Sequence, residues 1–107
     1  MTDYIVALST CLEKEADAIA TTLVESRKCA CVNIIRGVTS IYRWKGKTES
    51  ETESILLMKS VSGKEQELLE ELCKLHSYEV PEFIILPIRW GSKDYLQWIT
   101  ESTTTSA

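Results

Sequence analysis

The thiols and the only histidine of this chain are the residues whose types and spacing best suit metal chemistry. Cys29 and Cys31 form a C-x-C pair, and thiolates suit soft ions such as Cu(I) or Zn(II). A closed zinc site usually takes four ligands from two such pairs, so this pair is half of a motif. Cys73 and His76 are three residues apart in a helical pattern, so they can face the same direction and form a second chelating pair.

Core packing is the alternative explanation for these cysteines. Cys73 lies on an apolar stripe with Leu69 and Leu72, and free cysteine is among the most buried residue types. The same reasoning favours burial of Cys31. Cys11 falls in the first turn of a predicted helix, where we expect it to be exposed or half-buried.

A second group of candidate site residues interrupts otherwise apolar segments. Its members are Glu53, Lys59, His76, Tyr78 and Glu82. Buried charges persist only when they are paired, so Lys59 needs a carboxylate such as Glu53 or Glu82. The group has two interpretations: ion pairs that fix the register of a subunit contact, or a ligand-binding cleft that Trp44 and Trp90 could wall.

No pattern for catalysis is found in the sequence. The four glycines do not match the spacing of a nucleophile elbow or of a phosphate-binding loop, and no zinc-protease helix is present. A lone histidine needs a positioned nucleophile beside it, which the sequence does not identify. We therefore expect a protein that is not an enzyme.

Composition restricts the partners and the compartment. The 12 basic and 16 acidic residues give a net charge of −4, which disfavours binding to nucleic acid or to an anionic membrane. The first residues are acidic where a secretory signal is basic, and no stretch approaches the roughly 18 apolar residues of a membrane span. We expect a cytoplasmic protein whose four cysteines are all free of disulfides.

The elements that position these side chains follow the order β-α-β-β-α-β with an additional C-terminal helix. The expected ranges are strand 4–9, a helix from the Thr10 cap to about Lys28, strand 31–44 with a bulge at 36–37, strand 51–61, a helix from the Ser62 cap to about His76, strand 80–88 and a helix after Ser92. Two capping boxes are predicted to open the first two helices, Thr10 with Glu13 and Ser62 with Glu65. Residues 1–107 form one domain, in which 103–107 are a frayed tail.

This order predicts an α+β fold of the ferredoxin-like type, with an antiparallel sheet and both main helices on one face. The runs Ile55–Met58 and Phe83–Leu86 are apolar at successive positions, so they present hydrophobic atoms to both faces. A second copy of the chain is the simplest cover for the open face. We expect Leu57 and Ile85 on that face, and their neighbours Leu56 and Ile84 under the helices.

Four blocks of sequence resemble the CutA family of divalent cation tolerance proteins. They are ACVNIIxGVTSIYxWxGK from Ala30 to Lys47, the segment from Glu53 to Lys59, HSYEVPEFI from His76 to Ile84, and GxxxYLxWI from Gly91 to Ile99. The similarity extends in order from Ile5 to Ser102. The resemblance implies a tight homotrimer similar to the PII signalling proteins, in which the hairpin of the second and third strands reaches neighbouring subunits. It also implies a role in tolerance to copper and other divalent cations.

The copper ligands of some family members are largely replaced in this chain. Ser9 stands where those members have cysteine, and Leu75 stands where they have a histidine beside the one that matches His76. A metal ion would therefore need His76 together with Cys31, Cys73, Glu82 or a neighbouring subunit.

The alternative function is a PII-like sensor that binds a small molecule at the clefts between subunits. The predicted cleft residues are Trp44, Glu53, Lys59, Tyr78 and Glu82. The bound group is copper or another divalent cation in the first case and a small metabolite in the second. The sequence identifies no downstream partner.

Overall fold

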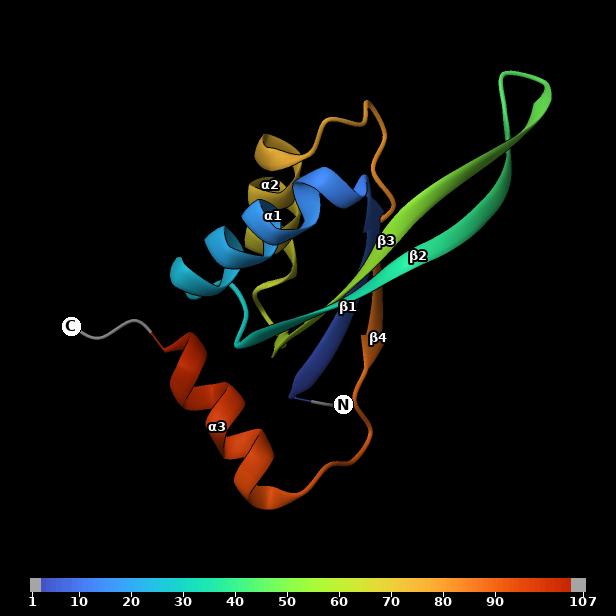
Figure 1. Ribbon diagram of the computed structural model, residues 1–107. Coiled ribbons are helices and arrows are strands. Elements are labelled where there is room, and N and C mark those ends of the chain that lie inside the picture. The colour runs from blue at the N-terminus through green and yellow to red at the C-terminus, as the bar shows by residue number, and fades with distance from the viewer. Residues whose placement is uncertain (1–2, 105–107) are drawn as a thin grey trace.

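The computed structural model describes residues 3–104 as a four-stranded antiparallel sheet with helices, in the strand order β2-β3-β1-β4 (Figure 1). The elements are β1 (Tyr4–Cys11), α1 (Glu13–Glu25), β2 (Cys31–Trp44), β3 (Lys47–Val61), α2 (Glu65–Leu75), β4 (Ile84–Pro87) and α3 (Lys93–Thr103). The predicted α+β class and the predicted order of elements are confirmed.

The hydrophobic core lies between one face of the sheet and the helices α1 and α2. Alternate residues of β1 and β3 point into it, so that Ala7 and its cross-strand partner Met58 are both fully buried. The helices contribute apolar residues at helical spacing. These helix residues are Ala16, Ile19, Leu23, Leu68 and Leu72.

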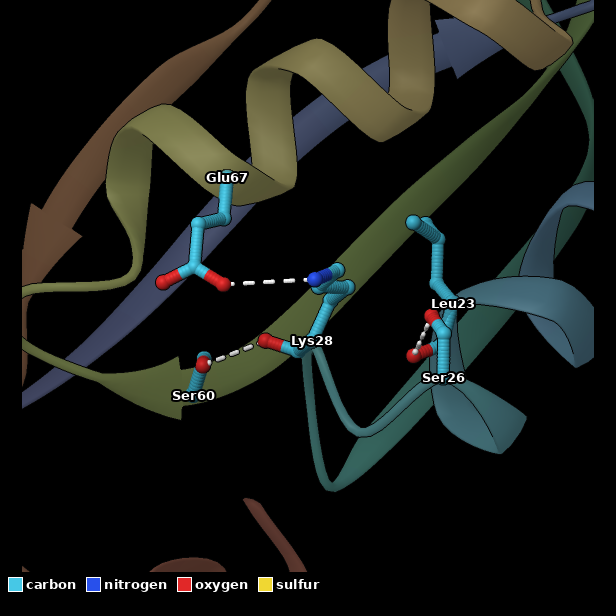
Figure 2. Close-up of polar contacts among 5 residues, drawn as sticks. All are labelled: Leu23, Ser26, Lys28, Ser60 and Glu67. Atoms are coloured by element: carbon cyan, nitrogen blue, oxygen red, sulfur yellow. Dashed lines mark hydrogen bonds and ion pairs between the residues drawn. The ribbon is translucent and has the colours of Figure 1, made fainter. Parts of the chain in front are cut away.

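Polar contacts hold the end of α1 against α2 and β3 (Figure 2). The backbone of Arg27 has a positive φ of 60°, which reverses the chain before the predicted helix end at Lys28. The Lys28 carbonyl accepts a hydrogen bond from Ser60 Oγ at 2.7 Å, and its ammonium lies 3.2 Å from Glu67 Oε1. The junction is therefore anchored to both neighbouring elements.

The long β2–β3 hairpin contains the predicted bulge. The register shifts between Ile35 and Val38, where Arg36 and Gly37 together lie opposite Ser54, so that β2 has one extra residue. Gly37 has a φ of +70°, which explains why glycine is suited to this position. Arg36 Nη2 lies 2.9 Å from Asp17 Oδ1 of α1, so the helix and the bulge are in contact.

Neither predicted capping box forms. Thr10 belongs to β1, the N-cap of α1 is Leu12, and Glu13 Oε1 instead accepts the Gly37 N–H at 2.8 Å. The N-cap of α2 is Lys64 rather than Ser62. The S/T-x-x-E pattern is present in both places. Its first residue, Thr10 or Ser62, lies in a strand or a turn instead of at the N-cap of the helix.

The face of the sheet opposite α1 and α2 is apolar and largely open. Ile84 and Leu86 are 47% and 48% exposed, and Leu57 is half-buried on the same face as predicted. The predictions for Ile84 and Ile85 are both wrong. Ile84, expected under the helices, lies on the open face, whereas Ile85 pairs with Ala7 and packs against the core. A continuous apolar run does not reveal which of its alternate positions point inward.

Two predicted segments near the C-terminus have different limits in the structure. β4 spans only Ile84–Pro87, so it is shorter than the predicted strand 80–88. Thr103, predicted in the frayed tail, is the last residue of α3 and is buried. The rest of that predicted tail, beyond Thr104, lies outside the described residues. None of the described helices has the length and apolar character needed to cross a membrane.

All four cysteines are free, as predicted. The expectations for Cys11 and Cys73 are wrong: Cys11 is buried in β1, and Cys73 is exposed on α2, because the buried face of that helix runs through Leu68 and Leu72. Burial raises the pKa of the Cys11 thiol to about 11 and that of the Cys29 thiol to about 12.

These differences in exposure predict an order of alkylation. At mildly alkaline pH, iodoacetamide should modify Cys73 first and Cys31 more slowly, while Cys11 and Cys29 should stay unmodified until the protein unfolds. Peptide mass spectrometry at successive times measures the order, and the denatured protein provides the control in which all four react. Early modification of Cys29 in the folded protein would contradict the buried position.

Candidate functional site

A groove of about 440 Å³ lies between the β2–β3 hairpin and the segment that follows α2. We call it the hairpin groove. It contains four of the five residues predicted for the cleft, which are Trp44, Glu53, Tyr78 and Glu82. The remaining lining residues were not identified from the sequence: Thr10, Ser40, Ile41, Tyr42 and Val80.

A buried carboxylate is the central group of the hairpin groove. Glu53 is only 4% exposed, and its Oε2 accepts a hydrogen bond of 2.5 Å from the Tyr78 hydroxyl. Within residues 3–104, no lysine or arginine forms an ion pair with Glu53. Burial and then the hydrogen bond to Glu53 raise the pKa of Tyr78, so the phenol stays protonated and donates.

Further carboxylates follow Glu53 along the same side of β3. Glu51 and Glu49 occupy alternate positions towards the tip of the hairpin, and their cross-strand partners are Ser40 and Tyr42. Burial, followed by the charge of Glu51, raises the pKa of Tyr42. The negative charge on this side of the hairpin favours a cationic ligand.

Tyr42 could have been found from the sequence. It precedes Trp44 by two residues on a predicted strand, and alternate residues of a strand face the same side. Both aromatic side chains line the hairpin groove. Thr10 could not be found in this way, because it was assigned to a helix cap.

His76 positions the segment that carries Tyr78. Its Nε2 lies 2.7 Å from the Thr10 carbonyl oxygen, and its Nδ1 accepts the Tyr78 backbone N–H at 3.1 Å. Because a carbonyl can only accept, Nε2 carries the proton and the ring is neutral. Both ring nitrogens are thus engaged, and binding of a metal ion at either one would break a hydrogen bond. The ring is 8% exposed.

The three predicted metal ligands do not form one group. Cys31 begins β2, Cys73 is exposed on α2, and His76 follows that helix. In the part of the chain that the structure describes, no three His, Cys, Asp or Glu side chains are arranged to hold a metal ion.

Lys59 lies outside the hairpin groove. Its ammonium donates to Asn33 Oδ1, so the predicted carboxylate partner is wrong. Asn33 lies on the neighbouring strand β2, two residues after Cys31, which is the cross-strand partner of Lys59. Trp90, considered as a wall of the cleft, lines a different hollow.

The sheet with helices on one face and an acidic, aromatic groove beside its hairpin define a small α+β protein. A family model described as CutA1 divalent ion tolerance protein matches residues 4–102. The chain therefore belongs to the CutA family, whose members are non-enzymatic tolerance and PII-like proteins.

Similar proteins cover nearly the whole chain. The divalent-cation tolerance protein CutA of Thermus thermophilus is 43% identical over 101 residues, which are 94% of this chain and 98% of that protein. The crystal structure of CutA from Xylella fastidiosa superposes with a TM-score of 0.93 at 36% identity, covering 96% of this chain and 100% of that one. The structure of the PII-like protein CutA from Nostoc sp. PCC 7120 superposes with a TM-score of 0.88 at 34% identity, covering 94% of this chain and 97% of that one.

Some relatives are longer than this chain. The match to Protein CutA of Mus musculus is 44% identical over 97 residues, which are 88% of this chain and 55% of that protein. The chain thus spans about half the length of this relative.

The hydrogen bond between Tyr78 and Glu53 predicts a pH effect on stability. Since the pKa of Tyr78 is higher in the folded than in the unfolded chain, the free energy of unfolding should fall as pH rises above about 10. Urea unfolding at several pH values should show a smaller fall in Tyr78→Phe. Glu53→Gln should reduce the fall in part, because the charge of Glu53 is one cause of the raised pKa. Equal pH slopes in all three proteins would contradict this assignment.

Proposed function

We propose that this protein acts in divalent-cation tolerance as a cytoplasmic homotrimer, with the hairpin groove as its ligand site between subunits. The observation that carries the proposal is Glu53, a buried carboxylate without an ion-pair partner in residues 3–104. A buried negative charge is costly unless a cation neutralises it. The four free cysteines support a reducing compartment.

The open face of the sheet supports self-association. Ile35, Ile84 and Leu86 are large apolar side chains that are each nearly half exposed on that face. Exposed apolar patches of this kind are typical of protein interfaces. The number three follows the resemblance to the PII-like members of the family. A trimer would bring the projecting β2–β3 hairpin of one subunit near its neighbour (Figure 1).

The chemistry of the groove favours a divalent ion with affinity for oxygen ligands. Carboxylates from Glu53 and Glu82 suit ions such as Mn(II), Zn(II) or Cu(II) better than Cu(I), which prefers thiolates. One subunit supplies too few ligands, so the neighbouring subunit or water completes the coordination. Cys31 and Cys73 do not line the groove, and both ring nitrogens of His76 are engaged by Thr10 and Tyr78, so these three residues are not included in the proposed site.

A sensor of a small organic cation is the second candidate. Tyr42, Trp44 and Tyr78 line the same groove as Glu53, and aromatic faces beside a carboxylate attract an ammonium group. In that case the effect on cation tolerance would be indirect.

Size exclusion with light scattering tests the assembly. We expect a species of three times the 12.1 kDa subunit mass. Leu57→Asp places a charge on the open face and should prevent assembly, whereas Leu57→Met conserves the volume and should leave the mass unchanged. A folded species of 12.1 kDa for the unmodified protein at micromolar concentration would contradict the trimer.

Calorimetric titration of the intact protein with Mn(II), Zn(II) and Cu(II) tests the site. Glu53→Gln removes the charge with little change of shape and should weaken binding at least about tenfold, a loss of about 1.4 kcal/mol. Glu101→Gln removes an exposed charge on α3, outside the groove, and should have no effect. Saturable binding of choline without uptake of any metal ion would favour the sensor. An equal loss of metal affinity in Glu53→Gln and Glu101→Gln would contradict the assigned site.

A further inference from the structure

A second hollow, also of about 440 Å³, lies between Tyr4, the loop Arg89–Gly91 and the start of α3. We call it the β4–α3 hollow. Tyr4 is the first residue of β1, whereas Thr10, in the hairpin groove, lies near the end of that strand. At about 3.3 Å per residue the two are roughly 20 Å apart. The β4–α3 hollow is therefore separate from the proposed site, and the inference below does not depend on the proposed function.

Two cations line this hollow in a chain of net charge −4. Arg89 lies in the loop after β4, and Lys93 is the first residue of α3. Both are exposed, and neither forms an ion pair with any residue between 3 and 104. Asp94 follows Lys93 in the helix but does not line the hollow. The hollow thus has an excess of positive charge.

Trp90 gives the hollow an aromatic surface. Its side chain is 83% exposed, the highest exposure among the large hydrophobic residues of the described chain. An indole face left in water is available to stack on a planar group. It lies in sequence between the two cations, so a ligand in the hollow can meet an aromatic face and positive charge together.

The walls of the hollow are anchored. The Ile88 N–H donates to the Tyr4 carbonyl oxygen at 2.9 Å, which fixes the start of the loop. The Tyr4 hydroxyl lies 2.6 Å from Thr100 Oγ1, which joins β1 to α3. A Cβ added to Gly91 would lie 3.0 Å from the Leu96 side chain, so the loop packs closely on the helix. Such a hollow needs little rearrangement to bind a ligand.

We propose that the β4–α3 hollow binds a small anion that carries a flat aromatic ring. The anionic group, a phosphate or a carboxylate, pairs with Arg89 and Lys93, since a guanidinium matches the geometry of both groups. The ring stacks on Trp90, and the Gln97 amide is available for a polar substituent. A volume of about 440 Å³ is within the range of small-molecule sites.

The composition of the hollow disfavours simpler ligands. An inorganic ion would leave the Trp90 face unused, and a neutral aromatic molecule would leave Arg89 and Lys93 unpaired. Phosphate and carboxylate share the recognition chemistry, so the experiment must separate them.

Titration of the assembled protein with phenyl phosphate, benzoate and inorganic phosphate tests the proposal. In ¹H–¹⁵N spectra we expect saturable shifts at the Trp90 indole, with smaller effects at Trp44 and Trp98, from phenyl phosphate or from benzoate. The probe that binds more tightly, phenyl phosphate or benzoate, identifies the anionic group. Inorganic phosphate should bind at least about tenfold more weakly because it cannot stack on the indole. Added salt should weaken binding.

Matched variants locate the site. Arg89→Gln and Trp90→Leu should each weaken binding at least about tenfold, whereas Lys74→Gln, which removes an exposed cation of α2, should not. The proposal is overturned if no probe saturates at millimolar concentration, or if Lys74→Gln has the same effect as Arg89→Gln. It is also overturned if the Trp90 indole is already protected from solvent in the assembled protein, because a neighbouring copy then fills the hollow.

Discussion

The structure depends on the covering of only one face of its sheet by α1 and α2. This constraint divides the residues of β1 and β3 into two sets. Ala7, Leu56 and Met58 are buried under the helices, whereas Leu57 and the exposed residues of β4 face the other side. On the second face Ile84 and Leu86 stay about half exposed, so the same alternation that builds the core also creates a surface for association.

A chain of hydrogen bonds links the elements that surround the hairpin groove. The Thr10 carbonyl accepts from His76, His76 accepts from the Tyr78 backbone, and the Tyr78 hydroxyl donates to Glu53. These contacts join β1, the end of α2 and β3. Glu53 pairs with Val38, the first residue after the bulge in β2, so the bulge lies directly beside the central carboxylate of the groove. The groove is thus held in place from several elements.

Hydrophobic periodicity was sufficient to predict the elements and their order, whereas polar and aromatic residues within apolar segments identified four of the nine residues that line the hairpin groove. It failed where a pattern is compatible with two arrangements. The run from Phe83 to Leu86 is apolar throughout, and only its pairing with β1 decides that Ile85 points inward. Cys73 follows Leu72 on a helix, and a rotation of about 100° separates a buried from an exposed position. The partner of Lys59 depends on the register of β2 and β3, which a single sequence does not specify.

The position of β1 in the sheet has a consequence for synthesis of the chain. The first strand occupies an inner place between β3 and β4, and Ile5 pairs with Pro87. Such a contact between distant parts of the sequence forms slowly, and it cannot form before most of the chain has left the ribosome. Until then one edge of β1 has unpaired backbone groups. The short β4 therefore acts as the closing strand of the nascent protein, and it protects that edge from pairing with other chains.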